Sequence, residues 1–288
     1  MPSHNVTPGQ PNLFQRIWYS IFPHTYKEKD ERRPYLGWLN TLVLHFRPKV
    51  VQERTLRFSL TWGLGGMAVV LVCLLFATGM MQKFVYQPVP DRAYASILHL
   101  QNDVFFGQLI RNIHHWSANI LLIVVFLHFL RVFFTGAFHP PRQFNWIIGL
   151  TMFVLILGAN FTGYLLPWDQ LAFWAVTICT GMFGYVPWIG DWLQAMARGG
   201  AEVGSATLVI FYTFHTTLVP VALVLLMGFH FWRVRKAGGV VDPRPPEEII
   251  EEKPEYVSTL PELLMRELAA ALALIAFVVV LAVFVDAP

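Results

Sequence analysis

Five histidines fall inside apolar stretches of this sequence, where an ionisable side chain is costly and usually has a function. Two stretches hold widely spaced pairs: His114 and His128 are 14 residues apart, and His215 and His230 are 15 apart. At 3.6 residues per turn, both intervals return to nearly the same helix face, about 21 Å further along the axis. Two parallel helices therefore bring the four imidazoles into two facing pairs. Neutral imidazoles in an apolar setting suit haem iron, so the spacing predicts two bis-histidine haems.

Arginines accompany these histidines at a mirrored spacing. Arg111 lies three residues before His114, and Arg131 lies three residues after His128. Residues three apart share a helix face, so we expect each guanidinium just beyond a haem ligand, in position for a propionate. The alternative is that both are interfacial side chains whose charged ends reach water. His115 has no partner at a matching spacing, and we interpret it as a packing residue.

Glycines repeat at the same interval in two further apolar stretches. Gly65 and Gly79 are 14 residues apart, as are Gly149 and Gly163. Because glycine has no side chain, a helix can approach a flat macrocycle closely at these positions. The alternative is small-residue packing between membrane helices, whose usual spacing is about four residues. The longer interval favours contact with two haems.

The composition is that of an integral membrane protein. Of 288 residues, 55% are hydrophobic and 14% are charged, against about 45–50% and about 25% in soluble domains. Such hydrophobicity excludes a disordered chain, and the low cysteine count excludes a disulfide scaffold. Cys73 and Cys179 form no Cys-x-x-Cys pair for zinc or a c-type haem. The net charge of +3 gives no indication of a nucleic-acid partner.

Five apolar stretches are long enough to cross a bilayer, which takes about 20 helical residues. They cover Phe58–Met81, Ile113–Phe134, Trp146–Leu166, Leu208–Trp232 and Leu263–Val285. Because lipid offers the backbone no hydrogen bonds, we predict an all-α integral membrane fold, with a four-helix haem-binding bundle and a fifth transmembrane helix. We expect the aromatic segment Trp168–Arg198 to form short interfacial helices rather than a sixth crossing.

The predicted organisation has four parts: a cytoplasmic N-terminal arm (1–55), a di-haem domain (56–238), a cytoplasmic linker (239–260) and the fifth transmembrane helix (261–288). Lys and Arg are concentrated in the arm and after the fourth span. The positive-inside rule then places the N terminus in the cytoplasm and the C terminus on the outer side. His114 is expected to face His215 near the outer surface. The pair of His128 and His230 is expected near the cytoplasmic surface.

Several motifs carry a family resemblance. They are Arg111–Ala118 (RNIHHWSA), Leu127–Val132 (LHFLRV), Gly163–Gln170 (GYLLPWDQ) with Phe173–Val176 (FWAV), and Phe211–Thr216 (FYTFHT). They resemble cytochrome b of the quinol-oxidising cytochrome bc complexes, and especially its short thylakoid-type (b6-like) members. The resemblance covers about residues 56–238, and the 15-residue histidine interval is the thylakoid-type spacing. The last span looks like the next helix of the full-length family pattern.

The resemblance implies two non-covalent b-type haems, a low-potential one on His114 and His215 and a high-potential one on His128 and His230. It implies quinol oxidation at the outer face, with one electron passing to a Rieske iron–sulfur protein. The other crosses both haems to a quinone near the cytoplasmic side, coupled to proton translocation. Arg235 is expected near a propionate or the quinone there. The outer quinone pocket is expected around Tyr164, Trp168, Ala175, Ile178 and Cys179.

The sequence departs from the family pattern at three points. Thylakoid-type members attach an extra haem through a cysteine before Leu-Gly-Gly; Gly63 stands there, so no covalent c-type haem is expected. Ile210 stands where an arginine is usual. The acidic Pro-Glu-Trp-Tyr motif that completes the quinol pocket is absent. Either a second polypeptide supplies that motif, or the protein does not oxidise quinol by the bifurcating route. The expected partners are a second cytochrome b chain carrying the motif, the Rieske protein and a cytochrome c-type subunit, in a homodimeric complex of the bacterial inner membrane.

Two other functions are compatible with membrane histidines. A di-haem membrane anchor would link a peripheral dehydrogenase or reductase to the quinone pool without bifurcation, although the stretch Gly163–Gln170 argues against it. A haem-free scaffold or transporter would use the histidines structurally. Haem content separates the haem-free scaffold or transporter from the two haem-binding functions, the bc-type subunit and the membrane anchor.

Overall fold

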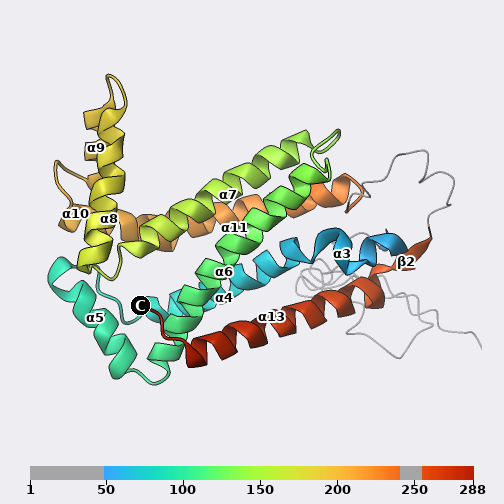
Figure 1. Ribbon diagram of the computed structural model, residues 1–288, viewed down its shortest axis with the longest axis horizontal. Coiled ribbons are helices and arrows are strands. Elements are labelled where there is room, and N and C mark those ends of the chain that lie inside the picture. Colours follow the sequence, from blue (N-terminus) through green and yellow to red (C-terminus); the bar gives the residue numbers. More distant parts are fainter. Residues whose placement is uncertain (1–48, 241–254) are drawn as a thin grey trace, which may run out of the picture. The chain divides into compact units, whose positions relative to one another are not determined.

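The computed structural model describes residues 49–240 and 255–288. Most of the expected N-terminal arm, and residues 241–254 of the expected linker, lie outside the described residues. Within the described part, five helices are long and apolar enough to cross a membrane (Figure 1). They are α4 (Leu64–Lys83), α6 (Gly107–Phe134), α7 (Gln143–Tyr164), the continuous run α10–η3–α11 (Ser205–Lys236) and α13 (Leu264–Phe284). The predicted all-α membrane fold is thus confirmed.

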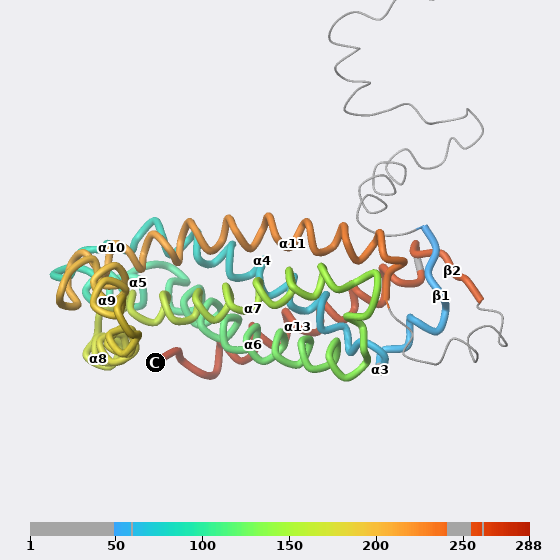
Figure 2. The backbone as a smooth tube through the Cα atoms, turned by 90° about the horizontal axis from the view of Figure 1, so that it is seen from above, coloured from blue at the N-terminus to red at the C-terminus, as the bar shows by residue number. Residues whose placement is uncertain are grey.

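The bundle is organised around two tightly packed helix pairs. Helix α4 packs along α6, and α7 packs along α11, while α6 and α7 join the two pairs (Figure 2). Helix α13 packs on α6 and α4, so the fifth helix covers one pair only. The main apolar core lies between these helices and includes Leu71, Leu121, Ile156 and Val278.

The first crossing begins later than the hydropathy predicts. A short helix, α3 (Phe58–Thr61), precedes α4 and is separated from it by Trp62 and Gly63. Both residues have positive φ angles, 53° and 63°, which a right-handed helix cannot accommodate. The chain therefore turns at Trp62 before the membrane helix begins at Leu64.

One end of the bundle, called here the α8 end, carries short helices. Helix α5 (Pro90–Asn102) is part of the connection from α4 to α6 along the chain. The periodicity of the sequence did not indicate this helix. Helix α8 (Gln170–Gly181), the turn η2 (Met182–Tyr185) and α9 (Gly190–Arg198) follow α7. Both α8 and α9 are too short to cross a membrane, as expected for this aromatic segment. The buried Arg198 side chain links them by donating to the Thr180 hydroxyl (2.7 Å) and the Thr177 carbonyl (2.9 Å).

The opposite end, called here the β end, is tied together by a two-stranded sheet. Strand β1 (Val50–Gln52) pairs antiparallel with β2 (Tyr256–Ser258). This pairing joins the segment that precedes α3 and α4 to the segment that precedes α13. The turns η1 (Glu53–Leu56) and η4 (Thr259–Leu263) continue each strand. Arg142 donates to the carbonyls of Ala237 (2.6 Å) and Gly239 (2.8 Å) and so caps the end of α11. Burial lowers the pKa of this guanidinium, which nevertheless stays charged at neutral pH.

Candidate functional site

One histidine pair lies toward the α8 end of the bundle. His114 on α6 and His215 on η3 (Phe214–Leu218) have ring centroids 6.2 Å apart. Imidazole nitrogens bind a metal at about 2 Å, so two rings that share one ion from opposite sides have centres about 6 Å apart. The observed separation therefore fits two imidazoles that would hold one iron between them. The predicted pairing of these two residues is present in the structure.

The Nδ1 atoms of this pair are held by neighbouring helices. The Thr78 hydroxyl donates to the Leu74 carbonyl (2.6 Å) and is left to accept from His114 Nδ1 (2.9 Å). His215 Nδ1 donates to the Ala159 carbonyl (2.9 Å). When Nδ1 carries the proton, Nε2 keeps the lone pair that binds a metal. Both rings are therefore oriented as metal ligands with Nε2 available.

The predicted glycines lie directly against the histidine rings. A Cβ atom on Gly79 would lie 3.1 Å from His114 Cε1, and one on Gly163 would lie 2.5 Å from His215 Cε1. The second contact is a hard overlap. The absence of a side chain at these two glycines therefore makes room for the histidine rings themselves. This is a second reason for glycine at these positions, besides the expected close approach to a macrocycle.

The second histidine pair lies toward the β end. His128 on α6 and His230 on α11 are near enough to interact electrostatically. His230 Nδ1 is buried beside the Asn145 backbone without a hydrogen bond of normal geometry. A Cβ on Gly65 would be 3.6 Å from His128, and one on Gly149 would be 3.7 Å from His230, which are ordinary contacts. The packing around this pair is looser than around the first.

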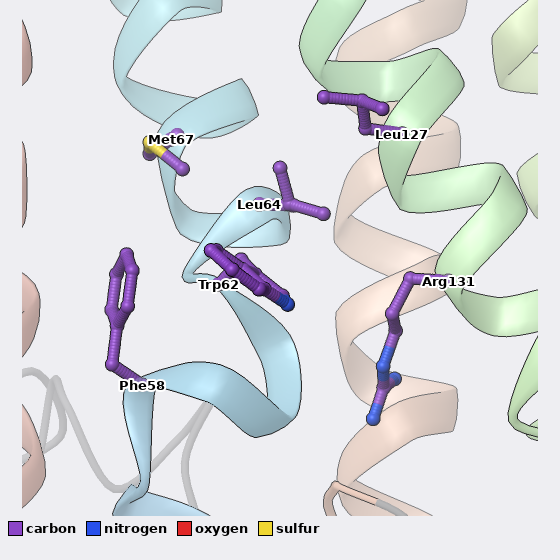
Figure 3. A pocket seen from close by; sticks show the side chains of 6 residues that line it. All are labelled: Phe58, Trp62, Leu64, Met67, Leu127 and Arg131. Carbon is purple, nitrogen blue, oxygen red and sulfur yellow. The ribbon is translucent and has the colours of Figure 1, made fainter.

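A cavity of about 490 Å³ opens between the chain around the start of α4 and the residues of α6 that flank His128 (Figure 3). Its walls are mostly apolar, and its lining residues are Phe58, Trp62, Leu64, Met67, Leu127 and Arg131. Arg131 Nε donates to the Leu60 carbonyl (3.2 Å), whereas its Nη2 is buried without a hydrogen-bond partner. An unpaired guanidinium nitrogen in an apolar cavity suits the acidic substituent of a haem. The residues present therefore fit a haem with a propionate near Arg131.

Arg111 has different surroundings from those expected of a haem contact. Its guanidinium donates to the carbonyls of Ala287 (2.9 Å) and Pro288, in the segment that follows α13. It also lies within electrostatic reach of Asp169 and Asp286. The carbonyls use part of the hydrogen-bonding capacity of Arg111, and the carboxylates partly balance its charge. Contact between Arg111 and a propionate therefore stays a prediction.

The residues expected around the outer quinone lie in one stretch at the α8 end. Tyr164 ends α7, and Trp168 lies in the following turn with a φ of +55°. Ala175, Ile178 and Cys179 share one face of α8, where Ile178 is 65% exposed. The cavity described above is at the other end of the bundle, so these five residues stay a prediction. Arg235, near the end of α11, is exposed at the β end.

Two tyrosines near the first histidine pair were not indicated by the sequence. The Tyr86 hydroxyl donates to the Leu166 carbonyl (2.7 Å), and its ring stacks on Tyr212 with centroids 5.6 Å apart. Burial, and then the neighbouring Tyr212, raise the pKa of Tyr86, so its hydroxyl remains a proton donor at neutral pH. These contacts join residues that are at least 80 positions apart in the sequence. A local sequence pattern therefore cannot predict them.

A π-helical turn contains one of the paired histidines. The turn η3 includes His215 and ends two residues before Pro220, which has no backbone N–H to donate. A π-turn holds one more residue than an α-turn and is frequent at functional sites. It therefore absorbs the extra residue of the 15-residue interval, and His215 and His230 match the 14-residue pair on α6.

The fold and the site together define a class: a multi-pass helical membrane protein with two pairs of histidines between its helices. Residues 51–238 match the family described as Cytochrome b/b6/petB. The cytochromes b6 of Synechococcus sp. (strain CC9902) and Prochlorococcus marinus (strain AS9601) are each 43% identical to this chain over 175 residues, which are 61% of this chain and 80% of each relative.

A solved chain of a hyperthermophilic respiratory Complex III has the same fold, with a TM-score of 0.73 and 24% identity. The match covers 88% of the present chain and 66% of that chain, so the present chain spans just under two thirds of its length. The chain belongs to the cytochrome b/b6 family. Membership makes it a haem-binding electron-transport subunit of a bc-type oxidoreductase complex.

Proposed function

We propose that the chain holds two b-type haems and conducts electrons between quinone sites on the two sides of a membrane. The arrangement of four histidines in two pairs supports this proposal, because the interval between pairs corresponds to about 21 Å along the helices. Bound haem would supply one-electron carriers at those two positions. The chain's own residues hold the imidazoles with Nε2 available at the first pair. Near the second pair, Leu127 and Arg131, which flank His128, line an apolar cavity.

The α8 end is proposed as the outer side and the β end as the cytoplasmic side of the bacterial inner membrane. Quinol oxidation is assigned to the α8 end, around Tyr164 and the exposed face of α8. His114 and His215 would hold the low-potential haem, and His128 and His230 the high-potential one. When bound, the two haems would supply a path across the membrane for one electron of each quinol, while the other electron passes to a Rieske protein. A second cytochrome b chain completes the quinol pocket, and the complex is a homodimer whose turnover is coupled to proton translocation.

Haem content tests the ligand assignment. The purified complex should contain two b haems per chain in a pyridine haemochrome assay. His128→Ala or His230→Ala should reduce this to one, because only one of the two imidazoles that would hold that haem remains. The matched control is His115→Ala, since His115 accepts a hydrogen bond from Asn119 on α6 and belongs to neither pair. Two haems in either ligand variant would contradict the assignment.

Co-purification tests the route of the electrons. A Rieske iron–sulfur protein should purify with the tagged chain in mild detergent, detected by its electron paramagnetic resonance signal. A haem-loaded chain that instead purifies with a peripheral dehydrogenase or reductase would indicate a membrane anchor without bifurcation.

A further inference from the structure

Lys83 and Tyr212 form a polar layer one helical turn beyond the first histidine pair. Lys83 follows Gly79 by four residues on α4, and Tyr212 precedes His215 by three residues on α10. Positions three and four residues apart share a helix face. Both side chains therefore lie on the faces that carry the site, and both are displaced from it toward the α8 end.

The two side chains are in contact. Lys83 Nζ lies 5.7 Å from the centroid of the Tyr212 ring, within the range of a cation–π interaction. The Tyr212 ring is itself stacked on Tyr86, whose hydroxyl is anchored on the Leu166 carbonyl. The ammonium group thus rests on a platform made by Tyr212 on α10 and by Tyr86, which follows α4 and is bonded to the segment that follows α7.

The positive charges at this end are compensated unequally. Arg111 is bonded to two backbone carbonyls and is near the carboxylates of Asp169 and Asp286. Among the described residues, the contact of the Lys83 ammonium is the Tyr212 ring, and no ion pair involves it. Lys83, which is exposed, therefore carries a charge that no carboxylate among the described residues neutralises.

We propose that Lys83 neutralises an acidic substituent of the haem held between His114 and His215, with Tyr212 as the platform that positions the ammonium group. This inference rests on the proposed function. Lysine suits the role because its flexible stem brings a compact point charge to a ligand edge. A positive charge close to a haem stabilises the reduced form, since reduction adds an electron. Lys83 is thus a positioning and tuning residue rather than an iron ligand.

A redox titration of the purified complex tests this inference. Lys83→Gln should lower the midpoint potential of the haem at His114 and His215 and leave the other haem unchanged. Lys83→Arg, which keeps the charge, should retain the original potential. The matched control is Lys236→Gln, because Lys236 makes the same kind of contact with Trp232 (5.9 Å) at the β end. That control should leave the potential of the first haem as it is.

The assignment of the shifted haem is checked in a His128→Ala background, where the remaining haem titrates alone. An unchanged potential in Lys83→Gln, with both haems present, would overturn the inference and leave the proposed function intact. A wild-type complex without b haem would overturn the proposed function itself. If Lys83→Gln fails to bind haem, Lys83→Arg decides: haem retained with the original potential supports a role of the charge, and haem lost there too refutes it.

Discussion

Gly163 is the most crowded position in the candidate haem sites. A methyl group there would overlap both Cε1 (2.5 Å) and Nδ1 (2.9 Å) of His215, while the neighbouring Thr162 hydroxyl lies 3.5 Å from the same Nδ1. The ring is thus fixed between a glycine, a threonine and the Ala159 carbonyl. A Cβ atom added to Gly65 or Gly149 would lie 3.6 or 3.7 Å from the nearest atom of the adjacent histidine ring. The four glycines therefore differ in how closely a histidine packs on them, although their spacing along the chain is the same.

This inequality gives a prediction for single alanine substitutions. Gly163→Ala should displace the His215 ring and remove the haem of that pair, at a cost of about 1–3 kcal/mol typical of overpacking. Gly149→Ala should lose less haem than Gly163→Ala, because its methyl group would make an ordinary contact with His230 and leave that ring in place. Gly158→Ala, on the same helix with nothing within 4 Å, is the control. Two haems in Gly163→Ala, measured by pyridine haemochrome, would contradict the prediction.

At the scale of the helices, hydropathy and spacing were enough to predict five crossings and the pairing of His114 with His215. Both follow from helical periodicity and from the length of a bilayer crossing. The start of α4 could not be predicted in the same way, because it depends on the positive φ angles of Trp62 and Gly63. Helix α5 is amphipathic and not apolar, so a search for membrane spans passes over it.

The π-turn at His215 shows why spacing alone was incomplete. An interval of 15 residues predicted the correct face only to within about 60°, whereas one inserted residue restores the register of a 14-residue interval. Threonine and proline after His215 gave no indication of where the extra residue lies. The structure assigns it to Phe214–Leu218.

A deletion tests the role of this turn. Removing Thr217, which is exposed, should convert the π-turn into an α-turn and leave both haems bound, because His215 and His230 keep their relative faces. Removing Ile123, which is 59% exposed on α6, should rotate His114 and His128 apart by about 100° and remove one haem. Haem content per chain is the measurement. Equal losses in the two deletions would show that the π-turn does not absorb the extra residue.

At the scale of the whole bundle, the segment after α13 fastens the fifth helix to the helix that carries His114. Asn112 Nδ2 donates to the Ala282 carbonyl (2.8 Å) and to Asp286 Oδ1 (2.9 Å), and Asn112 Oδ1 accepts from Ala287 N (3.0 Å). The Trp116 indole donates to the Val285 carbonyl (2.8 Å). The Asn112 side chain is buried, so each of these bonds replaces water that cannot reach it.

Replacing Asn112 should therefore loosen α13 without touching an iron ligand. Asn112→Leu keeps the volume but removes the side-chain partner of the buried Ala282 carbonyl and Ala287 N–H, at about 1–3 kcal/mol for each group. We expect a lower melting temperature in detergent and faster proteolysis after α13. Asn119→Leu is the control, because Asn119 bonds only to His115 on the same helix among the described contacts. If Asn112→Leu melts and is cleaved like the control, the contacts after α13 do not hold the fifth helix, and its packing on α4 and α6 alone is sufficient.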